Sequence, residues 1–217
     1  MLRIVIPARL ASSRLPEKML QPIGGRRVVE HSIDRVLAVA EPSDVWLTSD
    51  STEILQLAAG RCHAVLTSID ARSGSDRCAE VAEMEGWASD DVVVDVQADM
   101  PFLDPAHLAG FLRAANRGGR WDLLTAYTDL HTVEVRIDGF VRRASTCHIG
   151  LYAFRRDALR RFAALPTSPG EAAMRLEQMR AIENGFNVAF HAMPAMPFEI
   201  NTPEDLAMAQ GIAACLS

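Results

Sequence analysis

The sequence predicts an α/β fold in which a mostly parallel sheet carries helices on both faces. Short apolar runs rich in β-branched residues alternate with segments whose apolar residues recur at helical spacing. Strands that alternate with helices in this way pair in parallel and are covered on both faces. No internal repeat, low-complexity tract or linker interrupts the 217 residues, which favours a single domain over 1–217.

The first half of the chain supplies the alternation. The run over 2–6 is apolar and ends at Pro7, as a buried strand that enters a loop does. A helical apolar pattern begins after Gly24 and Gly25 and closes before Pro42, and Ser51 is a candidate cap for the next helix. We expect strands over 2–6, 44–48, 63–66 and 92–94, and helices over 28–39, 53–59, 76–84 and 107–115.

The pattern changes after Trp121. Strand-like segments cover 123–127, 132–137, 148–154 and 188–191, and helical patterns cover 157–162, 172–183 and the end of the chain from Pro203. The change predicts a small irregular sub-region over about 121–155.

Composition excludes several classes of protein. The 22 Lys and Arg residues against 28 Asp and Glu residues give a formal net charge of −6, and no long basic run offers a surface for nucleic acid or anionic membrane. The four cysteines are scattered without a C-x-x-C pair, as is typical of a reduced cytoplasmic protein. No window approaches the roughly 18 consecutive apolar residues of a membrane helix. We therefore expect a soluble, untargeted protein.

The loop after the first strand is unusually basic. It reads PARLASSRLPEKML and places Arg9, Arg14 and Lys18 around two prolines that prevent a regular helix. Ligands of open α/β sheets bind at the carboxyl ends of the strands, where this loop begins. Three cations, with Ser12, Ser13 and backbone N–H groups as neutral donors, could enclose an oligophosphate. Solvated loop charges are the alternative at about even odds, since no P-loop signature is present.

A second cluster, ARSGSDR, precedes a predicted helix. Ser73, Gly74 and Arg77 stand where a helix N-terminus attracts anions and where glycine permits a ligand to approach closely. A simpler interpretation is that Ser75 caps the helix, and for this motif alone that interpretation is favoured.

A third cluster, VVVDVQADMPFL, ends a predicted strand. Asp95, Gln97 and Asp99 share one face of a strand with period two, and a carboxylate at its carboxyl end suits a hard cation such as Mg²⁺. The alternative is a solvated strand edge, because Pro101 indicates that the chain turns toward solvent.

A fourth cluster combines HIGLY with the helical LEQMR and supplies His148, Tyr152, Glu177 and Gln178. His148 and Tyr152 face the same side of a strand, and hydrogen-bonded residues at the edge of the core would explain both. The last motif, NTPEDL, has Thr202 at a good helix start, and this structural role explains it without a ligand.

The motifs together resemble one family. IPARLASSRLPEKML, SGSDR, VDVQADMPFL, HIGLYAFRRDAL, LEQMRAIENG and INTPEDLAMA follow one another in the order typical of 3-deoxy-manno-octulosonate cytidylyltransferases, the CMP-KDO synthetases, over nearly the whole chain. The resemblance implies a nucleotide-diphosphosugar transferase-like fold, in which the sub-region over about 121–155 contributes to the acceptor pocket and to dimer contacts. It also implies a cytoplasmic, Mg²⁺-dependent homodimer of lipopolysaccharide biosynthesis that transfers CMP from CTP to the acid sugar KDO or a related ulosonic acid and releases pyrophosphate.

The same resemblance implies roles for individual residues. It makes Arg14, Lys18 and Asp99 catalytic, and Asp99 and Asn201 metal ligands. The nucleotide-binding residues that it implies are Pro7, Ala8, Arg9, Arg14, Lys18, Ser73, Gly74, Arg77 and Gln97. The implied acceptor-binding residues are Gln97, Arg142, His148, Tyr152, Glu177 and Gln178.

The chain departs from the family pattern near the metal and the acceptor. Met100 and Asn201 stand where the family has acids, Asp95 stands where it often has Asn, and Glu17 replaces a small residue. The segment 142–148 is shorter than usual. An amide oxygen can bind Mg²⁺ without supplying charge, so Asp95 is the candidate for compensation. Two alternatives stay open: CMP transfer to a different acid such as a phosphonate, and a non-catalytic nucleotide-binding relative.

Overall fold

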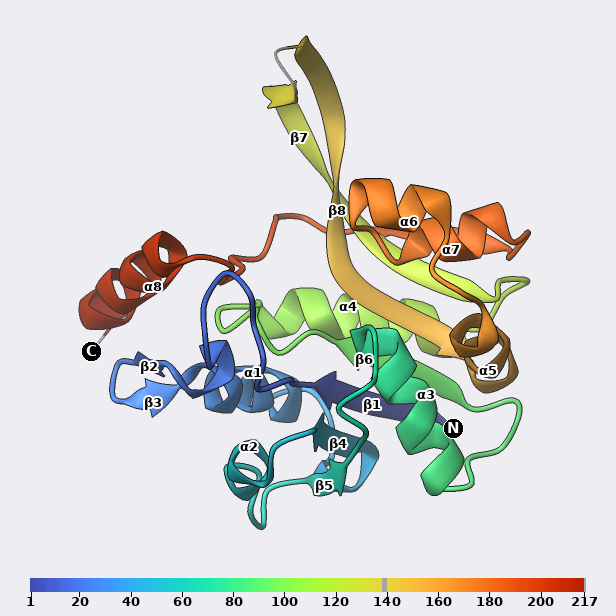
Figure 1. Ribbon diagram of the computed structural model, residues 1–217, viewed down its shortest axis with the longest axis horizontal. Coiled ribbons are helices and arrows are strands. Elements are labelled where there is room, and N and C mark those ends of the chain that lie inside the picture. Colours follow the sequence, from blue (N-terminus) through green and yellow to red (C-terminus); the bar gives the residue numbers. More distant parts are fainter. Residues whose placement is uncertain (138–139, 217) are drawn as a thin grey trace.

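The strands form one seven-stranded sheet in the order β5-β4-β1-β6-β8-β7-β9 (Figure 1). The computed structural model describes residues 1–137 and 140–216, and it describes side chains outside 130–145 and 216–217. The strands of the sheet are β1 (Leu2–Pro7), β4 (Val45–Ser49), β5 (His63–Leu66), β6 (Val92–Val96), β7 (Leu123–Ile137), β8 (Phe140–Arg155) and β9 (Val188–Ala192). A separate pair, β2 (Pro22–Ile23) with β3 (Arg26–Arg27), follows the loop after β1.

The sheet is mostly parallel, as the sequence predicts. β1 pairs in parallel with β4 and β6, β4 with β5, and β7 with β9. β8 runs antiparallel to both of its neighbours, β6 and β7. Two register shifts, at Thr125/Ala126 and between Asp129 and Val133, interrupt the β7–β8 pairing. The irregularity expected after residue 120 takes this form, within strands that continue the sheet.

Helices cover both faces of the sheet, which confirms the predicted layers. They are α1 (Val28–Leu37), α2 (Thr52–Gln56), α3 (Gly74–Met84), α4 (Pro105–Asn116), α5 (Arg156–Ala164), α6 (Pro169–Met174), α7 (Gln178–Glu183) and α8 (Pro203–Leu216). Two short 3₁₀ turns, η1 (Lys18–Leu20) and η2 (Pro42–Asp44), complete the elements. None of the described helices has the length and apolar character needed to span a bilayer.

The core divides into two apolar layers because strand side chains alternate between the faces. Ile4 and Ile6 of β1 pack with α1 and α4 on one face, whereas Val5 packs with α3 and α5 on the other. In β6, Val94 packs on the same face as Ile4 and Ile6, and Val93 packs on the same face as Val5. Each fully buried valine or isoleucine stabilises the fold by roughly 1.5–3 kcal/mol. The two layers fix the central strands rigidly, and with them the loops at their carboxyl ends.

One predicted helix is wrong. We expected a continuous helix over 172–183, but α6 ends at Met174 and α7 begins at Gln178. Arg175 has a left-handed backbone, with φ of 57° and ψ of 38°, and its N–H donates to the carbonyl oxygen of Glu171 at 2.7 Å. A left-handed residue after the last turn ends a helix, which the periodicity of the apolar residues does not reveal.

Candidate functional site

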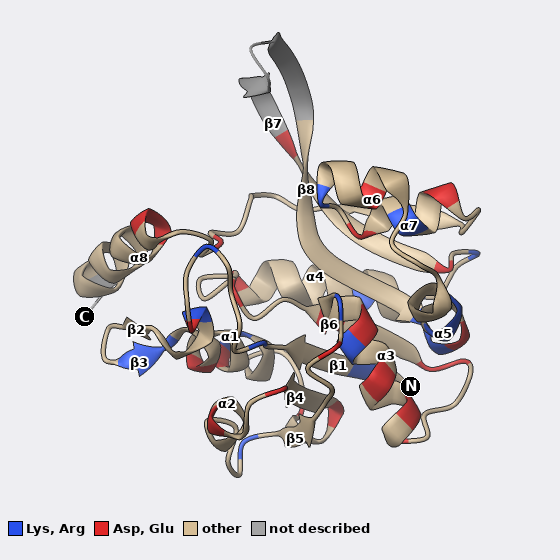
Figure 2. Cartoon of the chain, viewed as in Figure 1, with Lys and Arg blue, Asp and Glu red and all other residues tan. Residues whose placement is uncertain are grey.

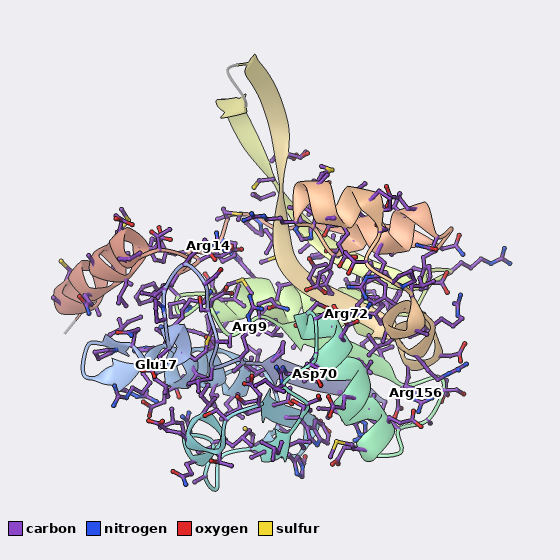
Figure 3. The ribbon with its side chains drawn as sticks, viewed as in Figure 1. Arg9, Arg14, Glu17, Asp70, Arg72 and Arg156 are labelled. Carbon is purple, nitrogen blue, oxygen red and sulfur yellow. The ribbon has the colours of Figure 1, made fainter. Side chains whose placement is uncertain are left out.

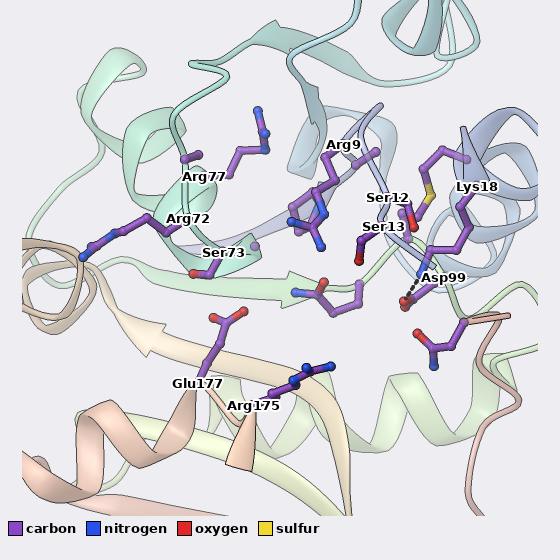
Figure 4. Close-up of a pocket in the computed structure, with 18 of the residues that line it drawn as sticks. Arg9, Ser12, Ser13, Lys18, Arg72, Ser73, Arg77, Asp99, Arg175 and Glu177 are labelled. Atoms are coloured by element: carbon purple, nitrogen blue, oxygen red, sulfur yellow. Dashed lines mark hydrogen bonds and ion pairs between the residues drawn. The ribbon is translucent and has the colours of Figure 1, made fainter. Parts of the chain in front are cut away.

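A cavity of about 390 Å³ opens at the carboxyl ends of β1 and β6 (Figure 4). The loop after β1, the segment that leads into α3 and the residues after β6 form one side of it. The segment between α6 and α7, together with Asn201 before α8, completes the lining. The cavity lies where ligands of α/β sheets bind, since the loops there converge from several strands.

The cavity brings together residues from all the predicted clusters. It is lined by the nine predicted nucleotide-binding residues Pro7, Ala8, Arg9, Arg14, Lys18, Ser73, Gly74, Arg77 and Gln97. Asp99, Asn201 and Glu177 line it as well. His148, Tyr152 and Gln178 are not among the lining residues, and the side chain of Arg142 lies outside the described ones.

Basic side chains dominate the lining. Figure 3 shows Arg9 and Arg14 on the loop after β1 and Arg72 on the segment before α3, and Figure 2 shows the basic residues of that loop among the charges of the chain. Six basic and three acidic side chains line the cavity: Arg9, Arg14, Lys18, Arg72, Arg77 and Arg175 against Asp99, Glu171 and Glu177. The excess of positive charge inside a concave site attracts anions, although the whole chain is acidic.

Two cations of the loop after β1 are held by residues from other parts of the fold. Lys18 is buried, and its Nζ lies 2.8 Å from Oδ2 of Asp99. Arg14 Nη2 donates to Oδ1 of Asn201 at 2.9 Å. Arg9 is exposed and has no hydrogen bond or ion pair with any described residue. The loop therefore presents one unpaired cation and two that already contact the predicted metal ligands.

The start of α3 approaches Gln97 closely. Ser73 is the cap, and its Oγ accepts the N–H of Asp76 at 3.2 Å. The alternative of Ser75 as the cap is therefore wrong, because the helix begins two residues earlier. A Cβ on Gly74 would lie 2.3 Å from Nε2 of Gln97, so glycine is required for this contact.

Asp95 lies beneath the cavity rather than in its lining. The side chain is fully buried and accepts hydrogen bonds from Gln97 Nε2 at 2.8 Å and Ser75 Oγ at 3.2 Å. Burial, and next the carboxylate of Glu177, raise the pKa of Asp95 well above its usual range. These bonds orient the amide of Gln97, so the structure gives Asp95 a positioning role in place of the metal contact considered for it.

Glu177 presents an unsatisfied acceptor to the cavity. Its Oε2 is buried and has no hydrogen-bond partner among the described residues. Burial raises the pKa of the carboxyl group, and the hydroxyls of Ser75 and Ser73 oppose that shift. Figure 4 shows the carboxyl group aimed into the cavity. A buried oxygen without a donor costs free energy, so the geometry favours a ligand that donates a hydrogen bond here.

The other predicted acceptor residues form a layer of their own. Tyr152 is buried, and its hydroxyl donates to Oε1 of Gln178 at 3.2 Å. The ring of His148 lies 5.4 Å from that of Tyr152, and its Nε2 is 2.9 Å from Oγ1 of Thr125. Burial lowers the pKa of His148 to about 4, so the ring is neutral at pH 7. This arrangement agrees with the alternative of hydrogen-bonded residues at the core edge.

The two residues predicted as metal ligands both belong to the cavity. Asp99 and Asn201 both line it, and the amide of Asn201 donates to Oε2 of Glu199 at 3.4 Å. The described residues contain no group of three His, Cys, Asp or Glu side chains that could hold a metal ion. A carboxylate and an amide oxygen fit Mg²⁺ nonetheless, because this ion commonly takes one or two protein ligands and completes its shell with phosphates and water.

Sequence reasoning missed several residues of the site. Arg72 stands inside the ARSGSDR motif and donates to Asp76 at 2.8 Å, and a count of the charges in the motif could have singled it out. The predicted helix over 172–183 includes Arg175 and begins directly after Glu171, so the sequence pattern does not indicate that these two residues line a cavity. Glu199 belongs to no quoted motif and is recognised only through its contact with Asn201.

The fold and the cation-lined cavity define a nucleotidyltransferase, and a family model described as Cytidylyltransferase matches residues 3–136. The chain belongs to the family of the 3-deoxy-manno-octulosonate cytidylyltransferases, the CMP-KDO synthetases. The protein is therefore an enzyme of the cytidylyltransferase class.

Relatives support this assignment along the whole chain. The 3-deoxy-manno-octulosonate cytidylyltransferase of Rhodospirillum centenum is 35% identical over 96% of this chain and 92% of its own length. The one of Azorhizobium caulinodans is 37% identical over 97% of this chain and 95% of its own length.

A solved structure of CMP:2-keto-3-deoxy-manno-octonic acid synthetase complexed with CTP is 29% identical, with a TM-score of 0.84 and coverage of 100% of this chain and 99% of that one. A cytidylyltransferase of Leptospira borgpetersenii, 17% identical with a TM-score of 0.71 over 99% of this chain and 87% of that one, shares the fold.

Proposed function

We propose that the protein transfers CMP from CTP to KDO or a closely related ulosonic acid and releases pyrophosphate. The observation that carries the proposal is a cavity whose cations come mostly from one side, with the unsatisfied acceptor of Glu177 opposite them. A triphosphate needs the cations, and a sugar acid offers hydroxyl groups as donors. The names of the relatives, and the CTP bound in the solved structure of one neighbour, support this choice of substrates.

The reaction needs little covalent chemistry from the chain. An oxygen of the acceptor forms a bond to the α-phosphorus, the bond from that phosphorus to the bridging oxygen breaks, and pyrophosphate leaves in line. The acceptor hydroxyl loses its proton to water. Arg9, Arg14 and Lys18 lie where they could hold the phosphate oxygens and offset the charge that develops on them.

Asp99 and Asn201 would hold the Mg²⁺ ion that we propose as cofactor. When bound, Mg²⁺ supplies positive charge to the phosphate oxygens. Lys18 already contacts Oδ2 of Asp99, which fixes that carboxylate beside the phosphate loop. Arg14 Nη2 donates to the side-chain Oδ1 of Asn201, while the backbone N–H of Asn201 donates to Oδ2 of Asp205 at 2.9 Å. Both candidate ligands are thus oriented by the protein before substrate arrives.

We further propose a cytoplasmic homodimer. β7 and β8 pair with each other from Leu123↔Phe154 to Ile137↔Phe140, whereas β6 reaches only the 151–155 part of β8. A pair of strands that extends beyond its neighbours in the sheet leaves its outer backbone edges free to pair with a second copy. Light scattering of the purified chain tests this proposal, and the mass of a single chain at micromolar concentration would refute it.

Pyrophosphate release tests the proposed reaction. The wild-type protein is mixed with CTP and Mg²⁺ and offered KDO, an amino-modified KDO and a set of phosphonates. We expect release with a KDO-type acid and, because it removes the charge of a proposed metal ligand, none with Asp99→Asn. Release with phosphonates alone would assign a different acceptor, and binding of CTP without release for any acid would indicate a non-catalytic relative.

A further inference from the structure

Arg175 stands at a turn that directs its side chain into the cavity. It follows α6 in a left-handed conformation, its N–H bonded to the carbonyl oxygen of Glu171. Residues with a Cβ rarely adopt this conformation. The turn breaks the helix, and Figure 4 shows the guanidinium reaching into the cavity from the wall that also carries Glu177.

The guanidinium of Arg175 has no partner among the side chains that the structure describes, unlike most basic groups of the cavity. Four of the six lining cations are bonded by the protein, in the pairs Lys18–Asp99, Arg14–Asn201, Arg72–Asp76 and Arg77–Thr67. Among the described residues, Arg9 and Arg175 alone of the six have no side-chain hydrogen bond or ion pair. They belong to different walls, Arg9 to the loop after β1 and Arg175 to the segment between α6 and α7.

Arg9 and Arg175 are both exposed, so their guanidinium groups are available to anionic groups of the ligands. Arg9 belongs to the loop assigned to the triphosphate. Arg175 lies two residues before Glu177, whose buried Oε2 has no donor. The 175–177 segment therefore offers a ligand one positive group and one acceptor, and a molecule with a carboxylate and hydroxyl groups complements both.

We propose that Arg175 binds the acidic group of the acceptor and so makes the enzyme specific for an acid rather than a neutral sugar. This inference rests on the proposed cytidylyl transfer, because it takes the acceptor to be the second ligand of the cavity. Arg175 is a specificity-determining residue here. A guanidinium suits this role because its fork of N–H donors matches the two oxygens of a carboxylate.

The test uses Arg175→Asn and Arg175→Lys. Asparagine tolerates a left-handed backbone, so Arg175→Asn removes the charge while keeping the turn, and Arg175→Lys keeps the charge without the fork. Arg117 follows α4 at its C-terminal end and does not line the cavity, so Arg117→Asn is the matched control. Binding of KDO is measured by calorimetry on protein saturated with CTP without added metal, and KM values come from pyrophosphate release.

We expect Arg175→Asn to weaken KDO binding and raise the KM for KDO by about 10- to 100-fold, as the loss of one charge-assisted hydrogen bond does. The KDO affinity and the KM for KDO of Arg175→Lys should lie between those of Arg175→Asn and the wild type. The KM for CTP should stay within about twofold, and Arg117→Asn should match the wild type. Wild-type protein should prefer KDO over its methyl ester, and Arg175→Asn should lose much of that preference.

Three results would overturn the inference. An unchanged KDO affinity in Arg175→Asn would show that the acid is bound elsewhere, and a rise in the KM for CTP alone would assign Arg175 to the nucleotide. Either result leaves the proposed reaction standing. KDO that fails to bind the wild type refutes both proposals, whereas wild-type binding that depends on Arg175 without pyrophosphate release supports the inference and refutes the reaction.

Discussion

Asp95 and Gln97 show how a buried group can set the orientation of a cavity residue. The carboxyl group of Asp95 has its Oδ1 against Nε2 of Gln97, which turns the amide oxygen of Gln97 away from this contact. The sequence predicts that Asp95, Gln97 and Asp99 share one strand face, but β6 ends at Val96, and only Gln97 and Asp99 line the cavity. Which of the three acts on a ligand was not predictable, because depth below the surface depends on the packing of α3.

The substitution Gly74→Ala, which adds one methyl group, tests whether the orientation of the Gln97 amide matters. Gly74→Ala places a Cβ 2.3 Å from Nε2 of Gln97, so the amide must move, and we expect its hydrogen bond to Asp95 to be lost. We expect kcat/KM for pyrophosphate release to fall about 10- to 100-fold, in keeping with the cost of a misplacement near 1 Å. Gly211→Ala on α8 is the control, since nothing lies within 4 Å of its new Cβ. Equal kinetics for Gly74→Ala and the wild type would show that the orientation of Gln97 does not matter.

Asn201 tests the proposed metal site. Asn201→Asp adds a negative charge where the family pattern has an acid, so the Mg²⁺ concentration for half-maximal pyrophosphate release should fall about 3- to 10-fold. The new carboxylate would also keep its contact with Arg14, whose Nη2 lies 2.9 Å from Oδ1 of the present amide. Asn201→Ala should raise this midpoint, the Mg²⁺ concentration for half-maximal release. A midpoint that rises in Asn201→Asp would indicate that repulsion from the adjacent Glu199 outweighs the gain at the metal.

Elements were predictable where apolar periodicity and caps act together, and less so where a single residue ends a helix. β5 has the bounds expected for it, and α3 begins only two residues before the expected start. The break between α6 and α7 depends on the left-handed backbone of Arg175, which sequence periodicity does not encode. The break matters for function because it turns Arg175 and Glu177 toward the cavity.

Arg180 ties three helices together behind the cavity. Its side chain is fully buried on α7, donates twice to Glu171 of α6 at 2.6 and 2.8 Å, and donates to Asp76 of α3 at 2.8 Å. These bonds hold the pKa of Glu171 below its usual range against the opposing effect of burial. The wall that carries Glu177 therefore depends on one guanidinium.

Removal of this guanidinium should destabilise the protein strongly. Arg180→Met removes the ion-pair partner of the buried Glu171 and leaves Asp76 with Arg72 alone, and we expect the free energy of unfolding to fall by about 3–5 kcal/mol, measured by urea denaturation. Arg160 on α5 is exposed and bonds only Asp157 among the described residues. Arg160→Met should therefore change the free energy of unfolding by less than about 1 kcal/mol. A similar small change in both variants would mean that α6 and α7 pack independently of this network.

At the scale of the whole molecule, the mostly parallel sheet and its two helical layers follow from the alternation of strands and helices in the sequence. The position of β8 between β6 and β7 does not follow from it, because antiparallel insertion brings together residues 92–96 and 151–155, which are far apart in sequence. The cavity is likewise a product of the whole fold, since Asn201 and the loop after β1 meet only through tertiary packing.

Acid sensitivity is a second property of the whole molecule. Burial lowers the pKa of His148 to about 4, below the unfolded value of 6.5, so the unfolded chain binds a proton first as the pH falls. Stability attributable to His148 is complete above pH 6.5 and is lost between pH 6.5 and pH 4. Between pH 7.5 and pH 5 this loss amounts to about 2 kcal/mol.

The variant His148→Gln isolates this contribution. Urea denaturation of both proteins at pH 7.5 and pH 5 gives four free energies of unfolding, and the wild type should lose about 2 kcal/mol more than the variant. The comparison removes the contributions of the other titratable groups, including Asp95 and Glu177, whose pKa values burial raises. Parallel losses in the two proteins would contradict a neutral, buried His148.

The central claim is that the cation-lined cavity binds CTP, and calorimetric titration of CTP into the wild type and Lys18→Ala tests it most directly. Lys18 is buried beside Asp99, so its removal takes away a cation and leaves an unpaired carboxylate facing the phosphates. We predict one CTP bound per chain in the wild type and affinity at least about tenfold weaker in the variant. Equal affinity in the two proteins would contradict the account, because the nucleotide would then bind outside this cavity.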